Sequence, residues 1–206
     1  QLISEWIDDG EVDLLNRLCV PLPIYVIADQ LGVPRSELTL LKKWSDASTS
    51  RLGRLADEEQ QIQNAKDIVE FQHYFADLID RMREHPEDNI ISDLANNTID
   101  EGRLLTKPEA LGMIQQILVA GNETSTNAIA GGVVLLIENA EEQAKLRANP
   151  DLIPTAVEEI LRLETPTSGM WRRATQDTEI DGVAIPEGSF LMVRFAVSYT
   201  HLRAHE

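Results

Sequence analysis

The sequence contains one cysteine, Cys19, and few basic residues for its length. A single cysteine excludes an internal disulfide, which is compatible with a reducing compartment. Eighteen lysines and arginines stand against 35 aspartates and glutamates, so the formal net charge at pH 7 is −17. Because a phosphate backbone would repel such a chain, the composition argues against a general nucleic-acid-binding protein.

The sequence also lacks a long uninterrupted apolar run and an initiator methionine. A membrane-spanning helix needs roughly 20 apolar residues. The longest apolar-rich stretch, residues 114–137, is interrupted by Gln115, Gln116, Asn122, Glu123 and Asn127. We therefore expect no membrane span, and no signal peptide is recognisable. The chain opens at Gln1 inside an amphipathic pattern, so we expect the natural sequence to continue upstream.

Apolar periodicity predicts that most of the chain is helical. Gly10 can split the first helix, and Pro21, Gly32 and Pro34 mark the ends of the next ones. The apolar stripe of the long polar helix at 57–84 consists of Ile62, Ala65, Ile68, Val69, Phe75, Leu78, Ile79 and Met82. The predicted helices cover residues 2–19, 21–31, 34–44, 57–84, 90–97, 106–139, 140–148 and 154–163.

From Trp171 onward the pattern changes to short runs separated by turn residues. Asp181-Gly182 and residues 186–188 are typical of turns, and the alternation in 178–185 and 189–195 predicts small strands. Many helices followed by a minor sheet indicate either an α+β domain or a mainly α domain with a small β-sheet, and we expect the latter.

The longest predicted helix begins with a capping box and carries an unusual motif in its middle. Thr106 stands at the cap with Glu109 three residues later. Residues 120–125 read Ala-Gly-Asn-Glu-Thr-Ser, which places a glycine, an acid and two hydroxyls in apolar surroundings. Thr124 can bond the carbonyl of Ala120 and open the helix locally, which would form a groove that holds a hydroxyl. The residues alone are equally compatible with a second reading, in which this is a kinked core helix whose Glu123 simply faces solvent.

This motif resembles the oxygen-binding signature of the cytochrome P-450 family. In that family the threonine stabilises iron-bound dioxygen and helps deliver protons, and the acid belongs to the proton path. The resemblance implies that Glu123 and Thr124 are catalytic and that Ala120, Gly121 and Thr124 lie against the haem. Adjacent helical residues do not face each other, so Glu123 is expected to act through water or by rotation.

Two further motifs follow in the family's order. Glu159 and Arg162 lie at i and i+3 on one helical face, and a plain surface ion pair is the alternative reading. The resemblance places this pair in a network that holds the haem-binding core. It also assigns Arg172 to a haem propionate, which a planar guanidinium binds well. Arg173 is expected to be exposed on the opposite side of the strand, and Ser168, Gly169 and Met170 to line the substrate pocket.

The resemblance covers about residues 3–196 and includes Pro21 to Pro34 and Lys43 to Asp46. It implies a soluble, cytoplasmic, bacterial-type haem-thiolate monooxygenase that inserts one oxygen atom of O₂ into an apolar small molecule. The cofactor would be haem b, with electrons from NAD(P)H through a ferredoxin or flavodoxin-type donor. Alternatives are a helical interaction or scaffold domain without cofactor, and a haem peroxygenase or a haem sensor that only binds.

The family's iron ligand is a cysteine in a loop downstream of the strands, and Cys19 does not fit that pattern. We therefore expect the partial domain at 1–196 to be truncated at both ends, to hold no metal ligand and to be inactive as it stands. Residues 197–206 resemble a translated sequencing adapter, so we expect a non-native tail. That reading makes the i, i+4 pair His201 and His205 accidental rather than a metal site.

Overall fold

The computed structural model describes residues 2–53, 57–99 and 102–195, apart from the side chains of 51–53. The chain divides into two compact units, Gln1–Thr126 and Asn127–Glu206, and the long helix α5 (Lys107–Glu138) runs from the first into the second. Each unit is described by itself. The expected boundary at 196/197 and the two histidines of the tail lie outside the described residues.

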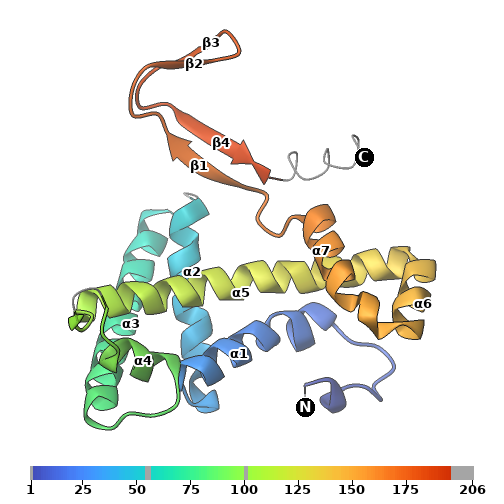
Figure 1. The fold of residues 1–206 in the computed structure, drawn as a ribbon, viewed down its shortest axis with the longest axis horizontal. Coiled ribbons are helices and arrows are strands. Elements are labelled where there is room, and N and C mark those ends of the chain that lie inside the picture. The colour runs from blue at the N-terminus through green and yellow to red at the C-terminus, as the bar shows by residue number, and fades with distance from the viewer. Residues whose placement is uncertain (1, 54–56, 100–101, 196–206) are drawn as a thin grey trace. The chain divides into compact units, whose positions relative to one another are not determined.

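The first unit is helical (Figure 1). From Pro21 onward its helices begin close to the predicted starts. α2 packs on α1 and α3, and α3 also packs on α4. The elements before α5 are η1 (Ile3–Glu5), η2 (Leu15–Cys19), α1 (Pro21–Leu31), η3 (Arg35–Glu37), α2 (Leu38–Gly53), α3 (Glu58–Glu84) and α4 (Ile90–Asn96).

The predicted helix at 2–19 is wrong as one element. A single 3₁₀ turn, η1, is followed by a break at Gly10, whose φ of +77° lies in the left-handed region. The chain becomes helical again after Asp13, whose carboxylate accepts a hydrogen bond from the Asn16 amide at 3.2 Å. It then forms the π-helical turn η2, which the apolar spacing gave no sign of. Glycine at position 10 therefore ends the first turn instead of bending one helix.

Helix α1 begins and ends as its prolines and glycine predict. Pro21 occupies the first turn, where a missing N–H costs nothing, and Gly32 adopts the left-handed conformation with φ +68°. The Val33 N–H donates to the Ala28 carbonyl at 2.9 Å, which closes the helix end. A Cβ on residue 32 would lie 2.5 Å from Asn89 Nδ2, so the start of α4 also requires glycine here.

The core of the first unit is centred on Trp44 of α2. Its ring lies between 5.2 and 5.9 Å, centroid to centroid, from Phe71, Tyr74 and Phe75 of α3. Each buried apolar side chain of this size contributes about 1.5–3 kcal/mol to folding. The Trp44 indole N–H, which cannot be left unpaired at low cost, donates to Glu70 at 3.1 Å.

The predicted apolar stripe of α3 is correct at five positions and wrong at three, Ile62, Ala65 and Val69, which are exposed. Ile62 and Val69 are about half exposed, whereas Phe71 is buried. Phe71 faces Trp44, so the aromatic cluster turns the buried face of α3 towards it and leaves Val69 outside. The members of the stripe that are buried are Ile68, Phe75, Leu78, Ile79 and Met82.

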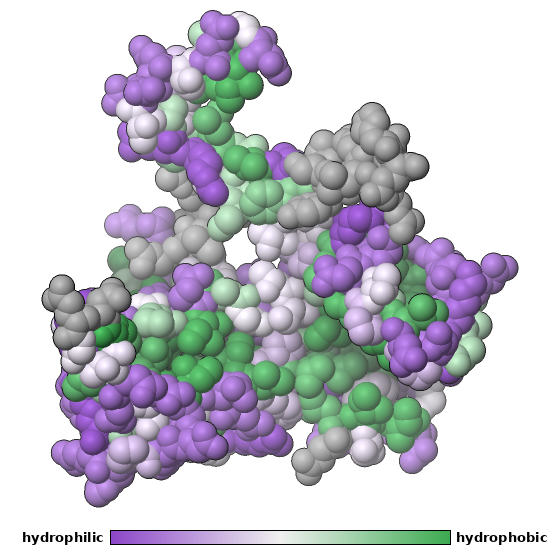
Figure 2. All heavy atoms as spheres, viewed as in Figure 1, coloured by the Kyte–Doolittle hydropathy of each residue, from purple (hydrophilic) through white to green (hydrophobic). Residues whose placement is uncertain are grey.

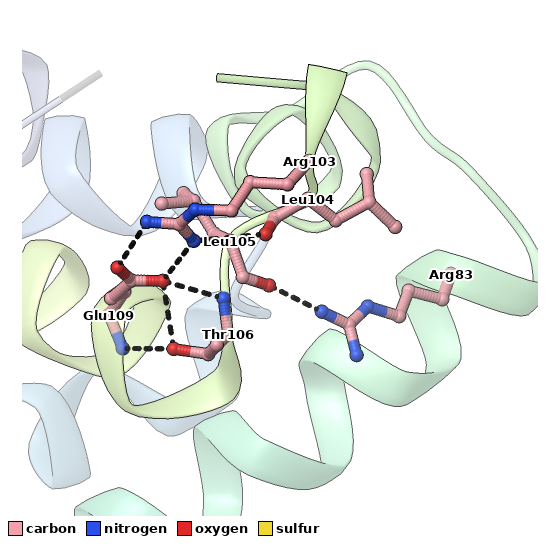
Figure 3. A network of polar contacts seen from close by, with 6 residues as sticks. All are labelled: Arg83, Arg103, Leu104, Leu105, Thr106 and Glu109. Atoms are coloured by element: carbon pink, nitrogen blue, oxygen red, sulfur yellow. Dashed lines mark hydrogen bonds and ion pairs between the residues drawn. The ribbon is translucent and has the colours of Figure 1, made fainter. Parts of the chain in front are cut away.

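Side-chain caps begin α3, α4 and α5. The Asp57 carboxylate accepts from the Gln60 amide at 2.8 Å, and Asn89 accepts from the Ser92 amide at 2.9 Å. At α5 the predicted capping box is confirmed (Figure 3). The Thr106 amide donates to Glu109 at 2.8 Å, and the Glu109 amide donates to the Thr106 hydroxyl at 3.4 Å.

Two arginines strengthen this helix start. Arg103 donates twice to the Glu109 carboxylate, both times at 2.8 Å. Arg83 reaches from α3 and donates to the Leu105 carbonyl at 2.9 Å (Figure 3). Together with the capping bonds from Thr106, the Arg103 guanidinium lowers the pKa of Glu109 to about 2. The start of α5 is thus fixed by charge-assisted bonds as well as by packing.

The second unit contains the last part of α5 and seven further elements among the described residues. Asn149 caps the 3₁₀ turn before α7, because its side-chain oxygen accepts from the Asp151 amide at 3.2 Å. After α5 the elements are α6 (Ala140–Ala148), η5 (Pro150–Leu152), α7 (Ile153–Glu164), β1 (Gly169–Arg173), β2 (Thr178–Ile180), β3 (Val183–Ile185) and β4 (Phe190–Arg194).

The strands form two antiparallel pairs, β1 with β4 and β2 with β3. Asp181 and Gly182, both with positive φ, form the tight turn between β2 and β3 that the sequence predicted. Gly169 pairs with Arg194, and Arg173 pairs with Phe190 at the other end of the ladder. The strand pairs carry exposed apolar residues, Trp171 and Phe190 among them. Figure 2 shows apolar surface on this part of the chain. The predicted class, mainly α with small sheets, is confirmed.

Within the described residues, no helix combines the length and the apolar character that crossing a bilayer would require.

The capping network at α5 predicts a pH-dependent contribution to stability. The pKa of Glu109 falls on folding from an ordinary value of 4.5 to about 2. Its stabilising effect is therefore complete above 4.5 and is lost as the pH falls towards 2. We expect Glu109→Gln to lower the urea midpoint at neutral pH and to approach the parent midpoint near pH 2.5. A difference between the two midpoints that stays constant over this range would contradict the assignment.

The close approach of β1 and β4 predicts that residue 169 must be glycine. A Cβ there would lie 2.6 Å from the Val193 carbonyl oxygen, a backbone atom that cannot move aside cheaply. We expect Gly169→Ala to speed amide hydrogen exchange at residues 190–194 by loosening the ladder. Gly112→Ala is the matched control, since a Cβ on residue 112 meets nothing within 4 Å. Equal exchange in both variants would show that the strands tolerate a side chain at 169.

Candidate functional site

The part of α5 in the first unit has one buried face and one open face. The buried face is a stripe of every fourth residue, namely Ala110, Ile114, Leu118, Asn122 and Thr126. The exposed residues Met113, Gln116, Ala120 and Glu123 recur at the same helical spacing on the other face. The helix therefore presents a small alanine and a carboxylate outward, with Thr124 half-buried beside them.

The Thr124 hydroxyl makes the hydrogen bond that the sequence predicted. Its Oγ1 donates to the Ala120 carbonyl at 2.6 Å, one helical turn back. The helical assignment nevertheless continues without interruption from Lys107 to Glu138, so the predicted local opening of the helix is wrong. The Ala120 carbonyl accepts the bond from the Thr124 hydroxyl, and the helix remains continuous at this point.

Gly121 lies on the side of α5 that meets α1. A Cβ on residue 121 would lie 3.2 Å from Ile27 Cδ1. The absence of a side chain therefore lets α1 approach α5 closely at this point. This packing explains glycine without reference to a ligand, and the expected contact between Gly121 and a cofactor stays a prediction.

Glu159 and Arg162 form the expected pair on α7. The Arg162 Nε and Nη2 atoms donate to the two oxygens of Glu159 at 2.7 and 2.6 Å. Both side chains are only partly exposed, at 33% for Glu159 and 19% for Arg162. The Glu159 carboxylate raises the pKa of the Arg162 guanidinium. A bidentate ion pair that is partly buried restricts both side chains more than an ordinary surface ion pair does.

The remaining predicted residues lie on β1 and just before it. Ser168 and Met170 are exposed, and the Ser168 carbonyl accepts from the Phe195 amide at 3.0 Å. Arg172 and Arg173 are both exposed, as expected for Arg173. The Arg173 guanidinium lies 5.9 Å from the centre of the Phe190 ring, whereas Arg172 bonds the carbonyl of Trp171 at 3.0 Å. Arg173 therefore already makes a cation–π contact with the strand that pairs with its own.

The residues can be tested against the haem that the sequence motif implies. The open face of α5 fits one side of a flat apolar group, because Ala120 is small and Thr124 supplies a hydroxyl next to it. Cys19 does not fit an iron ligand, since it is 1% exposed within η2 and burial raises the pKa of its thiol. Among the described residues, no group of three metal-binding side chains is placed to hold an ion.

The structure brings these residues together in separate groups. Ala120, Glu123 and Thr124 share the outer side of α5 in the first unit. Glu159 and Arg162 are paired on α7. Residues 169–172 lie on β1, directly after Ser168, in the second unit. One residue that sequence reasoning missed is Asn122, which is 3% exposed and lies in the buried stripe of α5. Its spacing of four from Leu118 was the available signal.

Comparison with known proteins identifies the family of the chain. A family model described as Cytochrome P450 matches residues 55–202. The cytochrome P450 monooxygenase PikC of Streptomyces venezuelae is 37% identical over 189 residues, which are 91% of this chain and 44% of PikC. The 6-deoxyerythronolide B hydroxylase of Saccharopolyspora erythraea is 35% identical and is covered to 46%. The chain thus spans less than half the length of these relatives.

The fold is also found in solved structures. The structure of P450BioI in complex with an acyl carrier protein ligated to hexadec-9Z-enoic acid superposes with a TM-score of 0.84 at 31% identity. That superposition covers 96% of this chain and 50% of the P450BioI chain. Since the family model matches well over half of the residues, the chain belongs to the cytochrome P450 family.

Proposed function

We propose that the whole protein is a haem-dependent monooxygenase that inserts one oxygen atom of O₂ into an apolar small molecule. The observation that carries the proposal is the Thr124 hydroxyl, which lies on the outer side of α5 beside Ala120 and Glu123. Neither side chain supports the core of the first unit, because Glu123 is exposed and Thr124 bonds a carbonyl of its own helix. Their presence is explained by chemistry carried out against that face.

The cofactor of the proposal is haem b, which when bound supplies the activation of dioxygen. The open face of α5 would lie against it through Ala120 and Thr124, with Gly121 reaching it from the side that meets α1, and Arg172 would bind a propionate. We assign Arg172 rather than Arg173 because Arg173 already lies over the ring of Phe190. Ser168, Gly169 and Met170 would line the substrate pocket, and the Glu159–Arg162 pair would hold the haem-binding core.

The geometry of Thr124 indicates how it would move a proton. Its hydroxyl proton is used on the Ala120 carbonyl at 2.6 Å, so its two lone pairs remain to accept. To donate towards a substrate, the hydroxyl must rotate away from Ala120 while it accepts a hydrogen bond from water. Glu123 is exposed and about 100° further round the helix, so it would supply that water with protons without touching Thr124.

The proposal includes electrons from NAD(P)H through a ferredoxin or flavodoxin-type donor, and a cytoplasmic location. Both follow from the resemblance to soluble bacterial members of the family. The proposed substrates are apolar small molecules, because Met170 and Trp171 at the start of β1 are exposed and apolar.

The proposal is tested in a PikC chimera in which this chain replaces the matching 189 residues of PikC. We expect Thr124→Ala to reduce oxygenated product by roughly two orders of magnitude, as for loss of a positioned proton donor. Reducing equivalents should be diverted to hydrogen peroxide, while the haem spectrum stays unchanged. Product yield and peroxide per NADPH consumed are the two measurements.

Two further variants make the comparison specific. Thr49→Ala is the matched control, because Thr49 makes the same kind of bond to a carbonyl four residues back, at 3.1 Å, in α2. Thr124→Ser keeps the hydroxyl and should restore most of the yield. A haem-loaded chimera in which Thr124→Ala oxygenates as well as its parent would favour a helical domain with no role in oxygen chemistry.

The chain as printed is expected to be inactive, because its only cysteine is buried away from any open face. We expect the reduced chain, supplied with haem and carbon monoxide, to lack the Soret band that is characteristic of thiolate-bound members of the family. If the band is present and disappears in Cys19→Ser, Cys19 is a ligand after all.

A further inference from the structure

The amide of Asn122 is buried between two helices in the first unit. Asn122 of α5 is 3% exposed and Ser45 of α2 is 1% exposed. Asn122 Nδ2 donates to Ser45 Oγ at 2.8 Å. The two helices are therefore joined by a direct side-chain hydrogen bond that water does not reach, immediately before Glu123 and Thr124 in the sequence.

Packing in the core does not require a polar side chain at this position. Asn122 continues the buried stripe of Ala110, Ile114 and Leu118, each of which is 0% exposed. Its Oδ1 atom is buried and has no donor among the described residues. A buried acceptor without a partner costs free energy that a leucine of similar size would not cost. Stability alone therefore does not account for asparagine here.

The Asn122 amide can fix the rotation of α5 about its own axis. Apolar packing is non-directional, so a purely apolar stripe allows α5 to turn slightly about its axis. A hydrogen bond forms at one rotation only, and a single buried asparagine is known to fix helix register at a cost in stability. With about 100° per residue, fixing Asn122 towards α2 places Glu123 and Thr124 at defined angles on the remaining surface.

We propose that Asn122 is a positioning residue, which through Ser45 fixes the rotation of α5 and so the direction of the Thr124 hydroxyl. This inference rests on the proposed function of Thr124. A second contact between the same helices, from Gln115 Nε2 to Ser48 Oγ at 3.2 Å, lies two turns earlier on α5. It holds the helices together at a distance from the Glu123–Thr124 step.

The first test measures the chain itself. In Asn122→Leu combined with Ser45→Ala both partners are removed, so neither leaves a buried polar group behind and stability should be nearly unchanged. We expect amide hydrogen exchange at residues 120–126 to become roughly two- to tenfold faster, which corresponds to the loss of one net hydrogen bond. Ser45→Ala alone, which removes a single oxygen, carries the same expectation if the double variant does not accumulate.

Gln115→Leu is the matched control for this test. It removes the other polar contact between α2 and α5, and it should leave exchange at 120–126 unchanged. Unchanged exchange at 120–126 in the Asn122 and Ser45 variants would overturn the proposal. Faster exchange there in Gln115→Leu would also overturn it, since any loosening of the interface would then have the same effect.

The second test separates this inference from the proposed function. In the PikC chimera the double variant should raise peroxide per NADPH consumed while melting temperature and haem spectrum stay as in the parent. If Thr124→Ala shifts this ratio and the double variant does not, Asn122 has no positioning role although Thr124 keeps its own. If neither variant shifts the ratio, the proposed function of Thr124 fails, and faster exchange at 120–126 would still show that Asn122 anchors the helix.

Discussion

The burial of one stripe of α5 is the constraint on which the candidate site depends. Ala110, Ile114 and Leu118 are completely enclosed, and a helix with 3.6 residues per turn that buries every fourth residue must present its other side outward. The outward side carries Ala120 and Glu123, with Thr124 next to them. The core of the first unit thus determines which residues of α5 can meet a ligand, before any ligand is considered.

The three consecutive polar residues at 122–124 of this helix have three different environments. Glu123 is exposed and needs no partner, Thr124 is satisfied by the carbonyl of Ala120, and Asn122 is buried with half of its amide unpaired. Only the last carries a cost in stability. A stretch that reads as a local defect in an apolar helix is therefore compatible with a regular α-helix, and its cost is confined to one side chain.

The sequence predicted those parts of the structure that depend on local chemistry. The capping box of Thr106 and Glu109 and the left-handed stop at Gly32 are decided by a few neighbouring residues, and both were found. The i, i+3 pair on α7 is local in the same sense. What the sequence missed depends on residues far apart: Phe71 replaces Val69 in the core because Trp44 lies opposite, and Asn122 is buried because Ser45 is there to meet it.

The side chains that would hold a cofactor differ in whether a neighbouring side chain already holds them. Glu159 and Arg162 are held by each other, and Arg173 is held by Phe190, so these side chains have their directions without a ligand. Arg172 bonds only a backbone carbonyl of its own strand among the described residues, which a carboxylate could readily replace. A side chain that is already fixed loses little conformational entropy when a ligand binds, whereas a side chain bonded only to its own strand must still be ordered. The Glu159–Arg162 pair therefore keeps its geometry with or without a ligand, and Arg172 is the side chain that would have to change partner to bind one.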